Sequence, residues 1–406
     1  MEGDQRQARD CPGTGGYGNR FILLLPKAHG VVMSHCRPAP LMNRPCHRTI
    51  RVACLATIPI GRRCPEWTLC SLRAAVLAML FASGAALAQG LDACTEEGRV
   101  LKIGFFHDFV PVSYSADPNP GSTGFHEHRG YEADLLTALE AMGAARFSRR
   151  AVGGAFFGIW LKAATPEYDL IGGGITIRED RTRDAGGQRV VVFTSGHIAF
   201  VQTLLVRAGD AGRFVGYRHF TPEVRIAAVP GTTGEERLLQ LTGYVGPDGA
   251  LRSGTRIHLA SGKVLEAGSD RRFVVTAARS SPELVDRRQL EPPENAEDMP
   301  QVIYYHGESA HLEALRIGAV DAVARGMIGN ADAVAESVGT FAIGARDPRR
   351  ELGGFALAVS DRLLASCLDR NIARLTDSGR IGYEQWRVDP TVFLRRAENA
   401  GKRAGG

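Results

Sequence analysis

The chain has 406 residues, of which 44% are hydrophobic and 23% charged, and a net charge of +5. That composition is ordinary for a globular protein, and the length is sufficient for two compact domains. Residues 1–88 carry 11 Lys and Arg against 4 Asp and Glu, which leaves 38 against 40, or −2, for the rest. A nearly neutral body gives no electrostatic reason to expect nucleic-acid binding.

The first predicted element is a secretory signal peptide at residues 71–89. A positive residue is followed by an apolar run at 74–82 and by the small-x-small cleavage site Ala86-Leu-Ala88. A transmembrane anchor would need about 20 apolar residues, and this run is shorter. We therefore expect residues 1–88 to be an upstream extension and a signal peptide, with cleavage near Ala88 and export of the mature protein.

Two cysteines remain after this cleavage. Six of the eight fall within the first 70 residues, and only Cys94 and Cys367 lie in the body. Export leads to an oxidising compartment, where an isolated pair most simply forms a disulfide. We expect it to join the segment before the first strand to the C-terminal helix.

Strand and helix patterns then alternate along the body, which predicts α/β lobes with mainly parallel pairing. The first set comprises a strand at 101–106, helices at 130–142 and 156–164, and strands at 168–174, 190–193 and 200–206. The second comprises strands at 225–229 and 301–305, then a helix, and then a strand at 319–324. The tail adds a strand at 355–360 and a helix at 363–375.

Residues 245–300 do not fit this alternation. They combine Gly, Ser, Arg and Asp with the cluster Glu291-Pro-Pro-Glu, and only 273–276 have a strand pattern. We expect an inserted excursion from the second lobe, a β-hairpin ending in a loose loop.

An ordered set of short motifs runs through the two lobes. They are Lys102-Ile-Gly, Phe109-Val-Pro, Gly130-Tyr-Glu-Ala-Asp, Asp169-Leu-Ile-Gly-Gly-Gly-Ile-Thr-Ile-Arg-Glu-Asp-Arg, Phe193-Thr-Ser and Gly231-Thr-Thr. In this order and spacing, from about Leu101 to Trp386, the chain resembles the extracellular solute-binding proteins of family 3, the polar-amino-acid binders of ABC importers.

The resemblance implies a two-lobed α/β fold of the periplasmic-binding-protein type II, in which two crossover strands act as hinges. Lobe 1 would comprise 99–200 plus 345–396, and lobe 2 would comprise 205–340. It also implies a periplasmic monomer without a cofactor, which closes over a small carboxylate-bearing molecule and delivers it to a permease.

The resemblance also assigns site residues. Arg181 matches the arginine that grips the ligand's carboxylate with its fork of donors; the alternative is a surface arginine paired with Glu179 or Asp180. A glycine run and a threonine would present backbone amides and a hydroxyl to the ligand, or form only a flexible turn; these residues are Gly172, Gly173, Gly174 and Thr176.

Two further pairs complete the predicted site. Thr232 and Thr233 lie at the expected start of a helix, where they can cap it, hold the carboxylate from lobe 2, or do both. Phe109 and Phe156 match the residues that sandwich the ligand's side chain, although core packing would explain them equally.

One position departs from the family pattern. Binders of α-amino acids carry an Asp that anchors the amino group, and Gly326 stands there, beside Arg325. A buried ammonium needs a compensating anion. Either Glu132 or Asp332 replaces the lost acid, or the ligand is a carboxylate without an amine or a small dicarboxylate.

Three other interpretations stay open. His107, His126 and His128 could hold a metal, since Glu127 lies between the last two, but a solvated loop is the simpler interpretation, and we expect no metal. The chain also resembles cyclohexadienyl dehydratases, lyases that need a general acid in the cleft. The candidate acids would be Glu132, Asp134 and His197. A sensor domain is the third interpretation, but no membrane-spanning pattern follows residue 396.

Overall fold

The computed structural model describes residues 93–218 and 220–404. The predicted upstream extension, the signal peptide at 71–89 and the cleavage site near Ala88 lie outside these residues. Within the described part of the chain, no helix combines the length and the hydropathy needed to cross a membrane.

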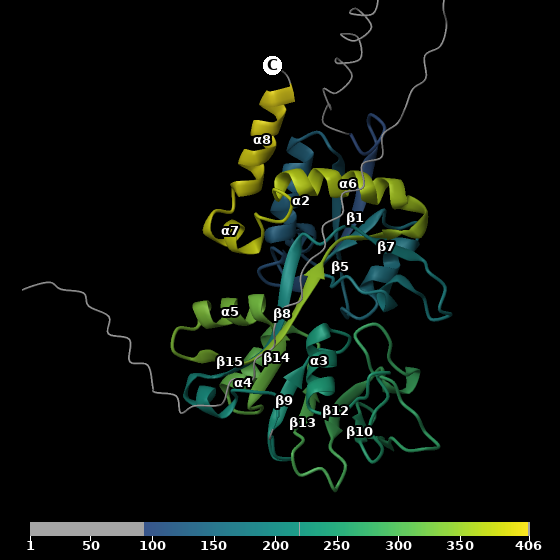
Figure 1. The fold of residues 1–406 in the computed structure, drawn as a ribbon, viewed down its shortest axis with the longest axis vertical. Helices are drawn as coiled ribbons and strands as arrows, with labels where there is room; N and C mark the ends of the chain where they lie inside the picture. Colours follow the sequence, from purple (N-terminus) through teal and green to yellow (C-terminus); the bar gives the residue numbers. More distant parts are fainter. Residues whose placement is uncertain (1–92, 219, 405–406) are drawn as a thin grey trace, which may run out of the picture. The chain divides into compact units, whose positions relative to one another are not determined.

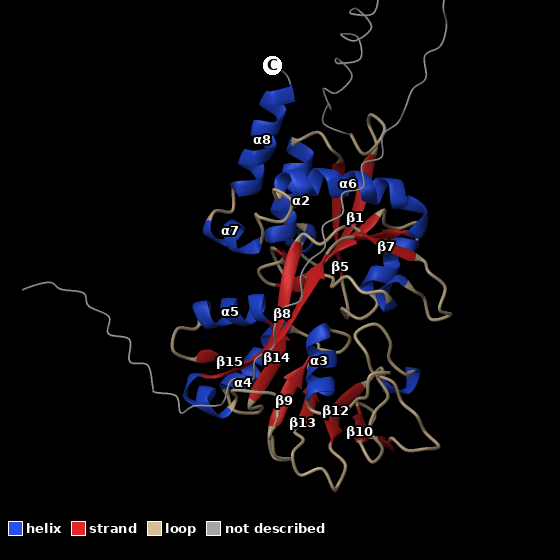
Figure 2. Ribbon diagram, viewed as in Figure 1, coloured by secondary structure: helices blue, strands red, loops and turns tan. Residues whose placement is uncertain are grey.

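The first sheet has five strands and forms the centre of what we call lobe 1 (Figures 1 and 2). Its order is β5 (Arg146–Val152), β1 (Val100–Phe106), β6 (Leu170–Gly172), β16 (Ala356–Ala358) and β7 (Val191–Phe193). β1 pairs in parallel with β5 and β6, whereas β16 is antiparallel to both neighbours. The apolar residues of β1 are buried from Ile103 onward, as expected for a central strand covered on both faces.

Helices and two small elements complete lobe 1. The helices are α2 (Tyr131–Ala141), α6 (Arg362–Leu375), α7 (Tyr383–Val388) and α8 (Val392–Ala404), and a small sheet contains β2 (Asp108–Phe109), β3 (Ser113–Ser115) and β4 (His128–Arg129). The apolar face of α6 packs with that of α2 in one core cluster. The helix predicted at 156–164 is the 3-10 helix η3 (Ile159–Ala164), which begins after Gly158 in the left-handed region at φ 77°. That prediction was wrong in both its type and its start.

The second sheet has eight strands and forms what we call lobe 2. Its order is β11 (Val264–Glu266), β10 (Arg256–Leu259), β12 (Arg287–Glu291), β13 (Gln301–Tyr304), β9 (Arg225–Ala228), β14 (Ala322–Gly326), β8 (Ile198–Arg207) and β15 (Phe341–Gly353). Its helices are α3 (Thr233–Leu241), α4 (Glu308–Arg316) and α5 (Met327–Glu336). β9 is parallel to β13 and β14, so α3 and α4 start at the ends of parallel strands.

Two strands connect the sheets. β8 follows β7 of lobe 1 in the chain and pairs with β14 of lobe 2. β15 runs antiparallel to β8 and leads back to β16 of lobe 1 (Figure 1). The pairing of β15 with β8 shifts register twice, on either side of Arg346. The predicted two-lobed α/β fold with two crossover strands is confirmed.

The segment 245–300 is a structured extension of the lobe 2 sheet. β10, β11 and β12 add three antiparallel strands to the edge at β13. The strand predicted at 273–276 was wrong, because these residues make only isolated bridges, Ala250 with Val274 and Val275 with Ser280. Phe273 and Val275 are apolar because their side chains fill the lobe 2 core. The segment therefore continues the lobe 2 sheet and is not a loose loop.

Cys94 and Cys367 are joined as a disulfide in lobe 1, with Cα atoms 5.4 Å apart. Cys367 lies on α6, and the backbone N–H of Cys94 donates to Ala144 just beyond α2. The bond therefore fixes the segment before β1 to the helical layer.

Candidate functional site

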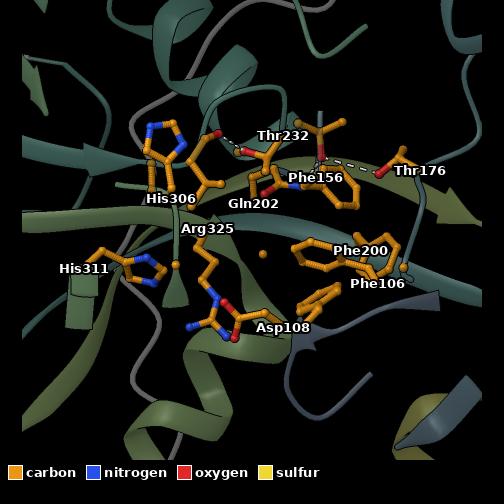
Figure 3. Close-up of a pocket in the computed structure, with 18 of the residues that line it drawn as sticks. Phe106, Asp108, Phe156, Thr176, Phe200, Gln202, Thr232, His306, His311 and Arg325 are labelled. Atoms are coloured by element: carbon orange, nitrogen blue, oxygen red, sulfur yellow. Dashed lines mark hydrogen bonds between the residues drawn. The ribbon is translucent and has the colours of Figure 1, made fainter. Parts of the chain in front are cut away.

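A cavity of about 110 Å³ is lined by residues from both lobes and from β8 (Figure 3). By the same measure a single water needs about 10–15 Å³, so the space suits a small organic molecule. Eight of the nine predicted site residues line it: Phe109, Phe156, Gly174, Thr176, Arg181, Thr232, Thr233 and Gly326. Gly173 lies behind the cavity wall, with its N–H directed at Glu132.

Arg181 is the most buried charged group of the cavity wall, with 1% of its surface exposed. Its guanidinium lies over the ring of Trp160, 4.4 Å from the centroid, and 5.6 Å from the centroid of Phe156. No described acid forms an ion pair with it, so neither Glu179 nor Asp180 is its direct partner. Burial, followed by the positive charge of Arg178, lowers the pKa of Arg181 to about 9. A buried cation without a paired anion favours an anion in the adjoining cavity.

Most N–H groups of Arg181 are already used by backbone carbonyls. Nε and Nη2 donate to Ala277, Nη2 also donates to Gly231 at 3.0 Å, and Nη1 donates to Thr176 at 3.2 Å. A guanidinium has five N–H groups, so one, on Nη1, has no partner among the described residues. Arg181 therefore joins the two lobes and can offer one N–H to a ligand; the predicted bidentate grip would require it to release a carbonyl.

The glycine loop after β6 is held in place by Glu132. The carboxylate of this fully buried residue accepts the N–H of Gly173 at 2.6 Å and that of Gly174 at 3.0 Å. Both glycines have positive φ, 129° and 67°, and a Cβ on Gly174 would lie 2.4 Å from the Phe109 ring. Glu132 thus shapes the cavity wall and is not the predicted partner of a ligand amine.

Stability should decline with rising pH because of Glu132. Burial raises its pKa from 4.5 to about 7, although the amides of Gly174 and Gly173 oppose the shift. The folded state then binds more protons than the unfolded state between pH 4.5 and about 7, so stability is greatest below this window and falls through it. Glu132→Gln should weaken this decline, which thermal melts of both proteins from pH 4 to 8 would measure. Parallel curves of melting temperature against pH for the two proteins would contradict the prediction. His197, whose pKa is lowered by burial to about 3, titrates in both proteins and therefore contributes equally to both curves.

The start of α3 forms the lobe 2 side of the cavity near Arg181. Thr232 caps the helix, since its hydroxyl accepts the N–H of Glu235 at 3.1 Å. Thr233 receives the Nε2–H of Gln202 at 2.8 Å and lies 3.5 Å from the Thr176 hydroxyl across the lobes. Thr232 therefore performs the capping role, and Thr233 and Thr176 bring two hydroxyls together at the cavity.

Four phenylalanines line the apolar part of the cavity. Phe109 and Phe156 were predicted, and the structure adds Phe106 at the end of β1 and Phe200 on β8. The Phe156 and Phe106 rings meet edge to face with centroids 5.2 Å apart, and Phe109 lies 6.0 Å from Phe200. Phe106 and Phe200 could not be distinguished in the sequence from ordinary strand residues.

Four polar residues of the cavity were also missed: Asp108, Gln202, His306 and His311. Asp108 begins β2 shortly after β1, Gln202 lies within β8, His306 precedes α4 and His311 lies in its first turns. None belongs to a motif, and only the position of Asp108 just after a strand could have indicated the site. Among the described residues that line the cavity, Asp108 is the only acidic one.

Several residues considered in the sequence lie elsewhere. Asp134 accepts the indole N–H of Trp386 at 2.7 Å, and His197 is buried 3.7 Å from Glu132, so none of the three candidate acids of a cleft lyase lines the cavity. Asp332, on α5, also lies outside the lining. His107, His126 and His128 bond to Val152, Ala151 and Ser113 respectively. No group of three potential metal ligands occurs among residues 93–218 and 220–404.

Beside the cavity, a second arginine bridges the lobes. Arg178 of lobe 1 bonds to both carboxylate oxygens of Glu236 on α3 and also pairs with Asp180. Together with the Arg181 contacts, this pair bridges the two lobes.

No protein-family model and no curated protein matches the chain. Solved structures do: holo ArgBP from T. maritima is 18% identical, with a TM-score of 0.44, over 71% of this chain and 96% of that one. The amino acid ABC transporter substrate-binding protein AbpA from Streptococcus pneumoniae, bound to L-arginine, is 14% identical with a TM-score of 0.46, over 75% and 95%. The ancestral amino acid-binding protein AncCDT-1, a precursor of cyclohexadienyl dehydratase, is 16% identical with a TM-score of 0.46, over 74% and 94%. Substrate-binding proteins are thus among the solved structures that match.

Proposed function

We propose that this chain captures a small carboxylate-bearing solute in the cavity and closes over it, as the periplasmic binding component of an ABC importer. The observation that carries the proposal is Arg181, a buried cation of the cavity wall that pairs with no carboxylate of the described residues. A ligand carboxylate would supply the missing anion, as well as acceptors for the remaining Nη1–H, for the hydroxyls of Thr176 and Thr233, and for the first N–H groups of α3.

The charges of the cavity lining support an anion. Its charged side chains are Arg181, Arg325 and Asp108. His306 and His311 both have pKa values lowered mainly by burial, so they are neutral at pH 7. The lining then carries one net positive charge, which favours an anionic solute. The glycine at position 326 agrees with a ligand that carries no α-amino group.

Closure would occur through the crossover strands. The register shifts of β15 around Arg346 interrupt its ladder with β8 between the two sheets. An interrupted ladder has fewer backbone bonds to break during bending, so the irregular part of β15 is the expected hinge. Arg178, Glu236 and the Arg181 contacts to Gly231 and Ala277 would form on closure.

A thermal-shift and calorimetry screen tests the proposal. The purified protein, freed of bound ligand by unfolding and refolding, is mixed with organic acids, dicarboxylates and amino acids. A ligand at 100-fold its Kd adds about 2.7 kcal/mol to the free energy of unfolding. We expect a clear rise in melting temperature with organic acids or dicarboxylates.

Two results would redirect the proposal. Tight binding of ordinary L-amino acids with no binding of organic acids would mean that Asp108 or another group anchors an amine. Release of carbon dioxide from a cyclohexadienyl acid, with turnover, would instead establish the lyase.

A further inference from the structure

We propose that the cavity holds a second acidic group of the same solute at the end formed by Arg325, His311 and the starts of α4 and α5. The solute would then carry two acidic groups, one at each end of the cavity. This inference rests on the proposed function, in which the first carboxylate lies near Arg181.

The polar groups of the cavity form two separate sets. Thr176 lies toward one side of the cavity and His306 and His311 toward the other, with Arg325 next to the histidines (Figure 3). Arg181 belongs to the first set, because its Nη1 bonds to the carbonyl of Thr176. The phenylalanine rings Phe156 and Phe200 lie toward the Thr176 side (Figure 3). A ligand that binds both sets therefore needs one acidic group near Arg181, an apolar part beside the phenylalanine rings, and a second acidic group near Arg325.

His311 is an unsatisfied polar group at the second end. It is 2% exposed and lines the cavity, and among the described residues neither ring nitrogen has a partner at hydrogen-bond geometry, although the backbone of Gly307 lies close enough to raise its pKa. Burial and then the charge of Arg325 lower its pKa to about 3, so it is neutral at pH 7. A neutral imidazole offers one N–H donor, which an acidic group of the ligand would satisfy.

Two helices also begin at this end. The N-cap residues of α4 and α5 are Gly307 and Gly326, both of which line the cavity. Neither provides a side-chain cap, and the first turn of α5 contains no acidic residue. The first-turn N–H groups and the helix dipoles therefore favour an anion beside Arg325.

Arg325 is held in position by its surroundings. A Cβ on Gly329 of α5 would lie 1.9 Å from its Nη2, so the guanidinium rests directly on this glycine. Its Nη2 also donates to the carbonyl of Val110 in lobe 1, at 3.5 Å. The Asp108 carboxylate, also from lobe 1, reaches the same end of the cavity, because a Cβ on Gly307 would lie 3.7 Å from its Oδ2. This end of the cavity thus already receives one carboxylate from the protein, and a ligand acid would share the arginine with it or displace it.

The test compares each diacid with its own half-amide. Calorimetry would measure the binding of short dicarboxylates, from succinate to adipate, and of benzene dicarboxylates, each beside the half-amide of the same length. We expect the best diacid to bind at least ~10-fold more tightly than its half-amide, because one charge-assisted hydrogen bond can supply a difference in affinity of this size. Equal affinities would overturn the inference while leaving the proposed function intact, whereas no binding by any acid would contradict the proposed function itself.

Variants assign the preference to this end of the cavity. Arg325→Met should abolish the preference for the diacid, and His311→Ala should reduce it several-fold. Gly329→Ala displaces the guanidinium without removing its charge and suits a helix, so it should also reduce the preference if Arg325→Met fails to fold. Arg316→Met, at an exposed arginine of α4 paired with Glu313, is the matched control. A full preference in both Arg325→Met and Gly329→Ala would overturn the inference.

Asp108 provides an independent test with opposite outcomes. Asp108→Asn removes a negative charge beside the proposed second acid, so the diacid should bind several-fold more tightly. If the diacid binds less tightly, the Asp108 carboxylate does not lie beside an acidic group of the ligand, and the inference is wrong.

Discussion

Replacing Arg181 with methionine is expected to abolish binding of the carboxylate solute. The substitution removes a buried cation from the cavity wall, and truncating one partner of a buried, hydrogen-bonded charge pair costs about 2–5 kcal/mol or more. This corresponds to a loss of roughly 30-fold to several thousand-fold in affinity. Arg181→Lys should retain part of the affinity, because it keeps the charge but not the fork of donors. Calorimetry with the tightest ligand of the screen would measure both.

Controls separate binding from folding in this experiment. Arg181 also donates to the carbonyls of Thr176, Gly231 and Ala277, so Arg181→Met should lower the melting temperature of the ligand-free protein as well. Arg183→Met is a matched control, since Arg183 is two residues away, exposed, and paired with Glu179. Undiminished affinity in a folded Arg181→Met protein would exclude a carboxylate at this end of the cavity.

Local patterns in the sequence predicted the elements that carry the site. The run Gly172-Gly-Gly after a short apolar strand predicted a loop of close backbone approach, and positive φ at Gly173 and Gly174 gives the reason. Thr232 before a helix pattern predicted a cap, and Thr232 caps α3. These signals were readable because a strand, a turn or a cap depends on residues adjacent in the chain.

Contacts between distant segments were not readable. The carbonyl of Ala277, which Arg181 uses, belongs to an insertion without a side-chain signal, and any residue type could supply it. Glu132 looked like a replacement acid for an amine, but two backbone amides 41 and 42 residues away hold it. His311 lies on an amphipathic helix, where a histidine is normally part of the surface or the core. Only the tertiary fold distinguishes these roles.

The insertion at 245–300 has a structural link to the cavity that was not expected. Arg287 of β12 pairs with Glu235 of α3 at 2.6 Å, and both side chains are almost completely buried, at 3% and 0% exposed. The other carboxylate oxygen of Glu235 accepts the N–H of Gly231, whose carbonyl receives Arg181. The insertion thus holds the loop before α3 through one buried ion pair.

Breaking this pair should strongly destabilise lobe 2. Arg287→Met leaves the Glu235 carboxylate buried without its cation, and removing one partner of a buried pair costs about 3–5 kcal/mol. Glu235→Gln leaves the Arg287 guanidinium buried without its anion and also weakens the bond to Gly231, so we expect a loss of similar size. Denaturant unfolding of each variant would measure the change in free energy.

The double variant Glu235→Gln/Arg287→Met decides whether the pair itself is responsible. Since both charges are absent, its loss of stability should be clearly smaller than the sum of the two single losses, with a coupling energy of about 0.5–3 kcal/mol. The same cycle on the exposed pair Arg316 and Glu313 should show little coupling, because solvent screens it. Additive losses at Glu235 and Arg287 would mean that each residue acts through its other contacts, such as the position of Arg287 over the Tyr304 ring. The insertion would then support the loop before α3 by packing rather than by charge.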